Sequence, residues 1–356
     1  MRLIAYKGAD TWLAAYADIT SDQQALGFDQ TLEWFEAYVM HVLEQPESSL
    51  MVGIVDEVSN RLLLGMPLLS GVSGRLSIQS LSALANYYTA LFQPVSPASD
   101  QSLRDVVSCF VSALGDGSLE WDEMSLEPMA RDAPFFCQLR HSLDACRCPY
   151  TVTECFTNWY LEVDGQSYET YEQSLPSKLR NTLRRKQRKL DRELGSTIRI
   201  IQDDSDLERF ICDYEMVYQK SWKSEESHPA FIREIIQCFA RKGWLKLGLM
   251  YISDKPVAAQ LWFVKDGVAS IYKLSYDEQY AKYSVGTILT AAMMKQVIDV
   301  DRVRLIDFLT GNDAYKRDWM SHKQERCRVR VFNRCTWRGR MLAFWNLKLK
   351  SVLRKS

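Results

Sequence analysis

Small residues at the start of a predicted helix form the part of this sequence best suited to chemistry. Ser284, Val285, Gly286 and Thr287 open a run whose apolar positions follow the 3.6-residue period of an α-helix. The first backbone N–H groups of a helix have no partner within the helix and lie at its positive end, so they bind phosphate groups well. Because small residues let an anion approach the backbone, we expect this turn to hold a pyrophosphate, and Lys282 can add positive charge.

Three predicted strands joined by tight turns lead into this helix. Asp266-Gly267 predicts a hairpin turn between the second and the third strand. A fourth strand follows the helix, and Tyr315 and Lys316 stand soon after it, at the predicted start of another helix. The strands cover residues 244–252, 257–264, 268–275 and 303–309. This order of elements indicates a cleft that binds a thioester.

The same order resembles the acetyl-CoA-binding core of the GNAT superfamily of N-acyltransferases. Within it, the sequence is most similar to the FemAB-like branch, which includes acetyltransferases linked to cellulose and exopolysaccharide production. The phrases that carry the resemblance are Tyr276-Asp277, residues 283–287, residues 307–311 and Tyr315-Lys316. The resemblance implies acetyl-CoA, or another acyl-CoA, as the cofactor of an acyltransferase.

In the GNAT pattern the last strand of the meander splays from its neighbour, and its backbone pairs with the pantetheine arm. Here that strand is 271–275, with an N–H near Leu274 facing the thioester oxygen. Tyr315 matches the position from which a tyrosine protonates the leaving thiolate, although it can equally be a tyrosine packed against the strand. The resemblance thus assigns cofactor binding to Leu274, Ser275, Tyr276, Lys282, Ser284, Val285, Gly286 and Thr287.

No residue stands out as the general base that removes a proton from the acceptor amine. Asp307 is a candidate, but it can equally anchor Lys316 or Arg317, and many acyltransferases deprotonate the amine through water. GNAT proteins usually receive the acceptor between two helices, predicted here at 205–222 and 229–242. The expected substrate contacts are Trp222, His228 and Lys316, with Glu225 and Glu226 close by; His228 also reads as a helix cap before Pro229.

The first half of the chain repeats this order of elements without repeating the sequence. We therefore predict an α/β protein of tandem GNAT-like domains, each a mixed, mostly antiparallel sheet flanked by helices. Residues 94–100 contain no glycine before the corresponding helix, so the first domain is expected not to bind the cofactor. The predicted domains are a degenerate one at 1–163, a basic connecting helix at 164–196 and an acyl-CoA-binding one at 197–356.

Tyr87 and Tyr88 follow Asn86 in a predicted loop of the first domain. An Asn-Tyr-Tyr run recurs in FemAB-like acetyltransferases, which implies a substrate contact. Tyrosine also suits half-buried surfaces, so the alternative is that the pair seals the interface between the domains.

Charge is distributed unevenly along a chain whose net charge is only −1. Residues 1–150 hold 8 Lys and Arg against 19 Asp and Glu, and the remainder holds 36 against 26. Eight of the cations lie on the predicted helix 178–194, around a narrow stripe formed by Leu179, Leu183, Leu190 and Leu194. This face is either a solvated surface or a contact for the cofactor 3′-phosphate, an acidic glycan, a membrane surface or transfer RNA.

Other features limit the classes of function. The nine cysteines are scattered, and the spacing of Cys146 and Cys148 fits neither a zinc pair nor a redox motif, so we expect reduced, mostly buried thiols and no metal. No apolar run reaches the length of a membrane span, which favours a cytoplasmic protein. Two alternative functions stay open: a Fem-like transferase using aminoacyl-tRNA, for which a long helical arm is missing, and a non-catalytic binding protein.

Overall fold

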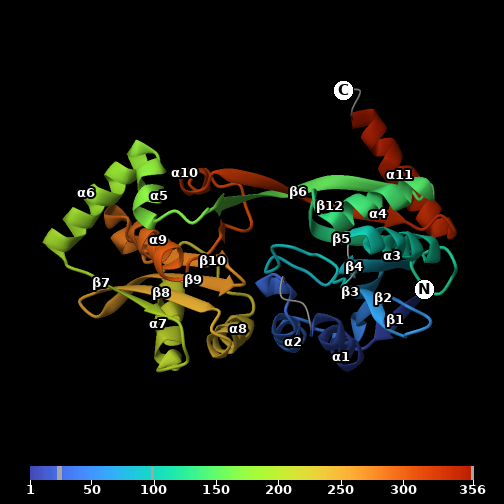
Figure 1. Cartoon of the computed structure of the whole chain (residues 1–356), viewed down its shortest axis with the longest axis horizontal. Coiled ribbons are helices and arrows are strands. Elements are labelled where there is room, and N and C mark those ends of the chain that lie inside the picture. Colours follow the sequence, from blue (N-terminus) through green and yellow to red (C-terminus); the bar gives the residue numbers. More distant parts are fainter. Residues whose placement is uncertain (22–25, 98–99, 354–356) are drawn as a thin grey trace. The chain divides into compact units, whose positions relative to one another are not determined.

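The computed structural model describes residues 1–21, 26–97 and 100–353, without the side chains of 100–101 and 348–353 (Figure 1). Part of the turn at 94–100, where the sequence lacks a glycine, therefore lies outside the described residues. The chain forms two compact units. Unit 1 comprises Met1–Phe156 and Gln324–Ser356, and unit 2 comprises Thr157–Lys323.

The two halves of the chain show the same order of helices and strands. The first series is β1 (Arg2–Lys7), α1 (Ala9–Thr20), α2 (Leu32–His41), β2 (Ser49–Val55), β3 (Leu62–Ser73), β4 (Ile78–Ala83), α3 (Asp100–Ala113), β5 (Glu123–Ala130), α4 (Pro134–Ala145) and β6 (Tyr150–Glu162). The second is β7 (Thr197–Ile201), α7 (Leu207–Gln219), α8 (Pro229–Arg241), β8 (Leu245–Ile252), β9 (Lys255–Lys265), β10 (Val268–Tyr276), α9 (Val285–Lys295), β11 (Leu305–Asp307), α10 (Lys316–Trp319) and β12 (His322–Phe332). Helices α5 (Tyr168–Ser174) and α6 (Ser177–Glu193) join the two series, and α11 (Trp337–Leu353) follows the second.

The mixed sheet is mostly antiparallel and helices flank it, so the predicted fold class is confirmed. In unit 1 the strand order is β1-β2-β3-β4-β5-β12, and in unit 2 it is β6-β11-β10-β9-β8-β7. The last strand of each series thus pairs in the other unit: β6 runs antiparallel to β11 at 160–162, and β12 runs antiparallel to β5 at 326–332.

This exchange of last strands makes the observed units differ from the predicted division. Residues 324–356, predicted to belong to the second domain, pack in unit 1, and unit 2 begins at Thr157 rather than after 163. The sequence pattern predicts two strands at the end of the first series, at 151–156 and 158–163, but the structure has one continuous strand there, β6. The sequence pattern did not predict β1, α1 or α11.

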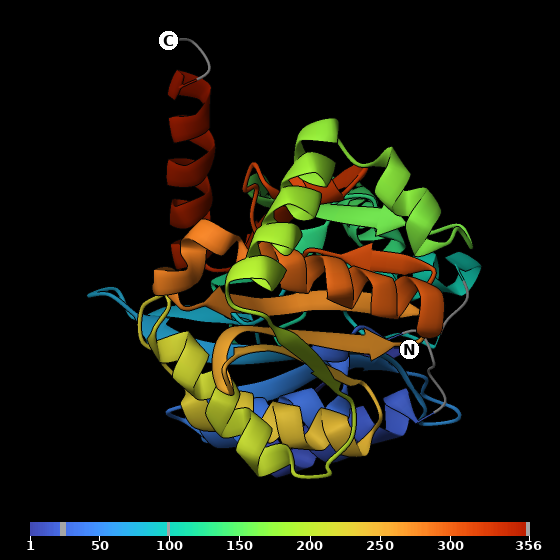
Figure 2. The same cartoon turned by 90° about the vertical axis from the view of Figure 1, so that its left-hand side faces the viewer.

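The sheet of unit 2 is covered by helices on both faces (Figures 1 and 2). Neighbouring strand residues point to opposite faces, and Trp262 and Phe263 of β9 illustrate this. Trp262 lies in a core cluster with buried residues of α5, α6 and α9. Phe263 packs edge to face on Phe239 of α8, with ring centroids 4.8 Å apart. Unit 2 therefore has α5, α6 and α9 on one side of its sheet, and α7 and α8 on the other.

The basic helix belongs to the core of unit 2 and is more than a connector. Leu179, Leu183 and Leu190 of α6 are buried in the same cluster as Trp262, as their spacing predicts, whereas Leu194 lies beyond the end of the helix and is exposed. The lysines and arginines occupy the remaining faces.

Two further expectations concern thiols and membranes. All nine cysteines are free, but only Cys327 is buried, so the expectation that most are buried was wrong. In the described ranges, none of the helices combines the length and the apolar character needed to cross a membrane. The cytoplasmic location stays a prediction.

Packing of α6 in the core of unit 2 can be tested with one substitution. Leu190 is fully buried, so Leu190→Ala should lower the free energy of unfolding by about 2–5 kcal/mol, since it removes apolar contacts and leaves a cavity. Arg188→Ala, on the exposed side of the same helix, should change it by no more than about 0.5 kcal/mol. Equal effects of the two variants in urea unfolding would contradict this packing.

Candidate functional site

Strands β10 and β11 run side by side for a short distance only. Their parallel pairing extends from Val268 opposite Leu305 to Ser270 opposite Asp307, where β11 ends while β10 continues to Tyr276. A β-bulge between Ile271 and Lys273 in the pairing with β9 adds twist at this point. Beyond Ser270, the edge of β10 that faces away from β9 has no strand partner in the part of the chain that the structure describes.

The backbone of this open edge presents hydrogen-bonding groups. Asp277 N–H donates to the carbonyl of Val257 in β9 at 2.9 Å. Because successive residues of a strand direct their backbone groups to opposite sides, Leu274 and Tyr276 direct theirs away from β9. The predicted N–H near Leu274 thus lies on the open edge, as the splayed-strand hypothesis requires. Its neighbour Ser275 is buried, and its hydroxyl has no hydrogen-bond partner among the described residues.

The turn before α9 leaves the start of the helix accessible to an anion. Ser284 adopts a left-handed conformation, with φ of 59°, and its side chain does not cap the helix. The N–H groups of Val285, Gly286 and Thr287 find no acceptor within the described ranges. The Val285 side chain is buried, so Val285 offers only its backbone.

Gly286 is required by close packing rather than by an unusual backbone conformation. A Cβ at this position would lie 2.9 Å from Cδ1 of Tyr276, a distance that real Cβ atoms essentially never show. Any side chain at 286 must therefore displace the ring of Tyr276. This contact holds the end of β10 against the start of α9, so the open edge and the turn form one continuous site.

Three lysines surround the residues just before this turn. Lys186 of α6 donates to the carbonyl of Lys282 at 2.5 Å. The ammonium groups of Lys189 and Lys282 each lie 5.1 Å from the centroid of the Tyr283 ring. The sequence analysis named only Lys282 individually, because the contact of Lys186 and Lys189 with this segment depends on how α6 packs.

The loop between α7 and α8 is fastened to the end of β10 at two points. Lys273 of β10 and Glu226 of the loop form a largely buried ion pair, with Nζ and Oε2 2.5 Å apart. The rings of Trp222 and Tyr276 lie against each other, with centroids 4.6 Å apart. Both contacts place the loop beside the open edge.

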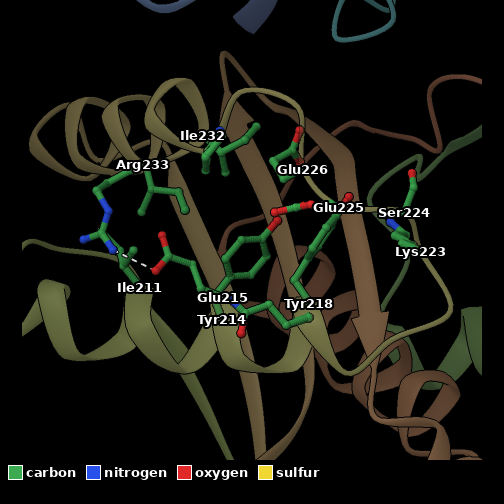
Figure 3. A pocket seen from close by; sticks show the side chains of 13 residues that line it. Ile211, Tyr214, Glu215, Tyr218, Lys223, Ser224, Glu225, Glu226, Ile232 and Arg233 are labelled. Atoms are coloured by element: carbon green, nitrogen blue, oxygen red, sulfur yellow. Dashed lines mark hydrogen bonds and ion pairs between the residues drawn. The ribbon is translucent and has the colours of Figure 1, made fainter.

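A pocket of about 470 Å³ lies between α7, α8 and this loop (Figure 3). One wall is apolar and consists of Ile211, Ile232 and Ile236. On the polar side, Tyr214 and Tyr218 extend from α7 towards the loop. The remaining lining residues are Glu215, Gln219, Lys223, Ser224, Glu225, Glu226, Pro229 and Arg233.

Two polar groups that line the pocket lack a hydrogen-bond or ion-pair partner among the described residues. The buried hydroxyl of Tyr214 neither donates nor accepts a hydrogen bond among the described residues. Burial raises the pKa of Tyr214, so this hydroxyl stays neutral. Glu225 forms no ion pair within the described ranges, unlike Glu215, which lies 2.8 Å from Arg233. Burial, and next the charge of Lys273, lower the pKa of Lys223 to about 8.

Tyr315 stands at the start of α10 with its side chain 43% exposed. Its ring packs edge to face on Phe308, with centroids 5.6 Å apart. Partial burial and the charge of Asp313 raise the pKa of Tyr315, so it carries its proton at neutral pH. Packing and proton donation, the two readings of this tyrosine, are therefore compatible.

Asp307 and Lys316 have partners within the protein. Asp307 accepts a hydrogen bond from Asn158 Nδ2 at 3.0 Å and another from the N–H of Leu309 at 2.6 Å. Lys316 is buried, and its ammonium donates to the carbonyl of Phe308 at 3.2 Å and to that of Thr310. Lys316 thereby holds the loop that carries Tyr315. The ammonium group of Lys316, which the sequence predicted to contact substrate, is thus already bonded to the backbone.

The other predicted contacts differ in accessibility. Trp222 is exposed beside Tyr276, and His228 precedes α8 without a side-chain cap. Tyr88 is only 2% exposed and Tyr87 is 62% exposed, so Tyr87 alone offers its ring to a ligand in unit 1. Tyr214, Lys223 and Lys273 were not predicted from the sequence. The signal for Lys273 was a lysine inside an apolar strand.

Comparison with known proteins agrees with this geometry. Residues 177–317 match a family model described as an acetyltransferase (GNAT) domain, which confirms the resemblance drawn from the sequence. No sequence of a curated protein matches the chain.

Solved structures share the fold at low sequence identity. FemX is 9% identical, with a TM-score of 0.58 over 92% of this chain and 97% of that chain. L-PGS from Bacillus licheniformis is 11% identical, with a TM-score of 0.57 over 99% of both chains. The C-terminal domain of a protein assigned as a lysylphosphatidylglycerol synthetase from Agrobacterium fabrum is 14% identical, with a TM-score of 0.56 over 96% of both chains. At these identities the likeness concerns the fold alone.

The two lysines at the pocket should respond oppositely to removal of their charge. The pKa of Lys223 is about 8 in the folded protein against an ordinary 10.5, so the unfolded chain binds more protons between these pH values and stability rises with pH there. Lys223→Met should therefore raise the thermal unfolding midpoint below pH 8, and the gain should fade towards pH 10.5.

Lys273→Met is the matched variant, since it leaves the Glu226 carboxylate buried without this lysine. Removing one partner of a buried ion pair is costly, so this variant should lose roughly 3 kcal/mol at neutral pH. Destabilisation by Lys223→Met at pH 7, similar to that of Lys273→Met, would show that Lys223 also contributes a favourable ion pair.

Proposed function

We propose that this chain, whose residues 177–317 form an acetyltransferase domain of the GNAT family, moves an acyl group from acetyl-CoA or another acyl-CoA to an amine. The transfer is direct and takes place in a ternary complex. The acceptor is a small molecule or a sugar.

One observation carries the donor assignment: the open edge of β10 is continuous with the uncapped start of α9. A pantetheine arm consists of amide groups, which can complete the missing hydrogen bonds at Leu274 and Tyr276. The pyrophosphate that follows is held by the N–H groups of residues 285–287, with Lys186, Lys189 and Lys282 supplying positive charge.

The pocket between α7 and α8 receives the acceptor. Glu225 and the hydroxyl of Tyr214 lack partners among the described residues and are suited to hold an amine. The charge of Lys223 lowers the pKa of a nearby amine and so favours its neutral, nucleophilic form. Either Glu225 or water takes the proton that the amine loses.

The chemical step forms one bond and breaks another. The amine nitrogen attacks the thioester carbon, the carbon–sulfur bond breaks, and the thiolate leaves with the electron pair. Tyr315 carries its proton at neutral pH, because burial and the charge of Asp313 raise its pKa, and it donates this proton to the thiolate. An N–H on the open edge of β10 stabilises the developing oxyanion.

A Fem-like transfer from aminoacyl-tRNA is the second candidate. It is favoured by the exposed cations of α6, which include Arg184, Arg185 and Arg188, beside the same turn. Against it, the longest helix of unit 2 is α6 itself, with 17 residues, and unit 2 contains no long helical hairpin. Native mass spectrometry of the full chain with acetyl-CoA, and separately with aminoacyl-tRNA, distinguishes the two donors. Binding of neither would favour a non-catalytic protein.

Gly286→Glu tests the donor site. The new side chain must displace Tyr276 and places negative charge where the pyrophosphate is expected, so CoA affinity in calorimetry should fall at least about tenfold, or about 1.4 kcal/mol. Lys295→Glu at the other end of α9 changes charge in the same helix and should leave CoA affinity nearly unchanged. Unchanged affinity in folded Gly286→Glu protein would remove this turn from the donor site.

Tyr315→Phe tests the proton donor once an acceptor has been found by screening amines for thiol release. The variant loses only a hydroxyl, so CoA affinity should be maintained while kcat drops roughly ten- to a thousand-fold. Tyr6→Phe in unit 1 is the control and should retain full turnover. Wild-type kcat in Tyr315→Phe would leave water as the source of the proton.

A further inference from the structure

Helix α11 has a composition unlike that of the other helices. Residues 337–356 include six lysines and arginines and no acidic residue. The same segment holds Trp337, Phe344 and Trp345 together with several leucines. Neither the donor site nor the acceptor pocket uses any of these residues.

The face by which α11 packs on unit 1 is made of small and polar residues. A Cβ at Gly339 would lie 2.1 Å from the carbonyl oxygen of Asn333, so the backbones meet closely there. Asn346 accepts a hydrogen bond from Arg330 at 3.0 Å, and Ala343 is buried between these two contacts in the sequence. Arg338 lies 3.9 Å from Asp122.

Both tryptophans of α11, together with Phe344 and Leu347, are consequently left outside this packing face. Trp337 is 54% exposed and Trp345 is 60% exposed, and Phe344 and Leu347 are also exposed. Arg340 is exposed too, and Lys348 and Lys350 follow in the sequence. In both Figure 1 and Figure 2, α11 projects away from the sheet of unit 1.

This arrangement reverses the usual one, in which a surface helix buries its large apolar side chains and exposes small or polar ones. Clustered exposed aromatic residues mark a surface that binds a membrane or another molecule. Tryptophan prefers the boundary between apolar and polar surroundings, and a helix that combines it with lysine and arginine is typical of binding in the plane of a membrane interface.

We propose that α11 attaches this protein to the surface of a membrane that contains anionic lipids. Trp337 and Trp345 enter the interface, and the surrounding cations pair with lipid phosphates and other negative headgroups. The charge decides between a membrane and a protein partner. The cores of protein interfaces are depleted of lysine, whereas this segment has no acidic residue and holds five lysines and arginines besides Arg338, which complements an anionic surface. The proposal does not depend on the reaction assigned to unit 2.

Flotation of the full chain with lipid vesicles tests this attachment. The protein should float with vesicles of phosphatidylcholine and phosphatidylglycerol and stay behind with vesicles of phosphatidylcholine alone. Trp345→Gln combined with Trp337→Gln should reduce the bound fraction at least about tenfold, because each indole loses its burial in the interface. Met40→Gln replaces another apolar residue, 71% exposed on α2, and should bind as the unaltered protein does.

Two substitutions that reverse the charge of an arginine test the role of charge and of this particular helix. Arg340→Glu on α11 should weaken flotation, as should high salt, whereas Arg188→Glu on the exposed side of α6 should not. Loss of flotation in Arg188→Glu alone would place the lipid contact on α6 and overturn the proposal.

Two other results would also overturn it: equal binding to both kinds of vesicle, and no binding to either. If the tryptophan variant instead changes the sedimentation of the protein without lipid, then α11 is a contact between copies of this chain. Because the substituted residues are exposed, we expect the thermal unfolding midpoints of all variants to be unchanged. Measuring these midpoints checks that the variants are folded.

Discussion

The early end of β11 is the constraint on which the site in unit 2 depends. Parallel pairing stops after Ser270 and Asp307, and the bulge at the same level adds twist to β10. Backbone groups at a strand edge must be satisfied by water or by another chain of amides. The turn before α9 meets this edge through the contact of Gly286 with Tyr276, and the loop between α7 and α8 meets it through Glu226 and Trp222. The residues proposed to bind the donor and those that line the pocket therefore lie beside the same strand end.

Positive charge is concentrated around this edge, and most of it is balanced locally. Lys273 pairs with Glu226, and Lys316 donates to two carbonyl groups. Lys223 differs, because it forms no ion pair within the described ranges, and burial together with the charge of Lys273 lowers its pKa to about 8. An uncompensated, partly buried cation costs stability, and such costs are commonly retained where a ligand or a reaction requires the charge.

Exchange of the last strand links the two halves of the chain in a way that local sequence does not reveal. Each series of elements supplies the strand that completes the sheet of the other unit, through β6 in unit 2 and β12 in unit 1. Neither series of elements therefore supplies every strand of one sheet by itself. The parallel pairing of β4 with β5 extends over only three residues, as does that of β10 with β11. The short parallel pairing is therefore a feature of the fold in both halves of the chain. The uncapped start of α9, in contrast, depends on the particular residues of unit 2.

The sequence by itself determined the elements whose signals are local. Periodicity located α6, α7, α8 and α9, Asp266-Gly267 set the hairpin turn, and Ser284 to Thr287 marked the uncapped helix start, because these depend on residues that are neighbours along the chain. Tertiary structure alone decided the rest. Lys273 meets Glu226 across 47 positions, Lys186 reaches Lys282 across 96, and the strand pairings cross from one half to the other. Such contacts follow from packing and pairing between distant segments, which no local pattern of residue types encodes.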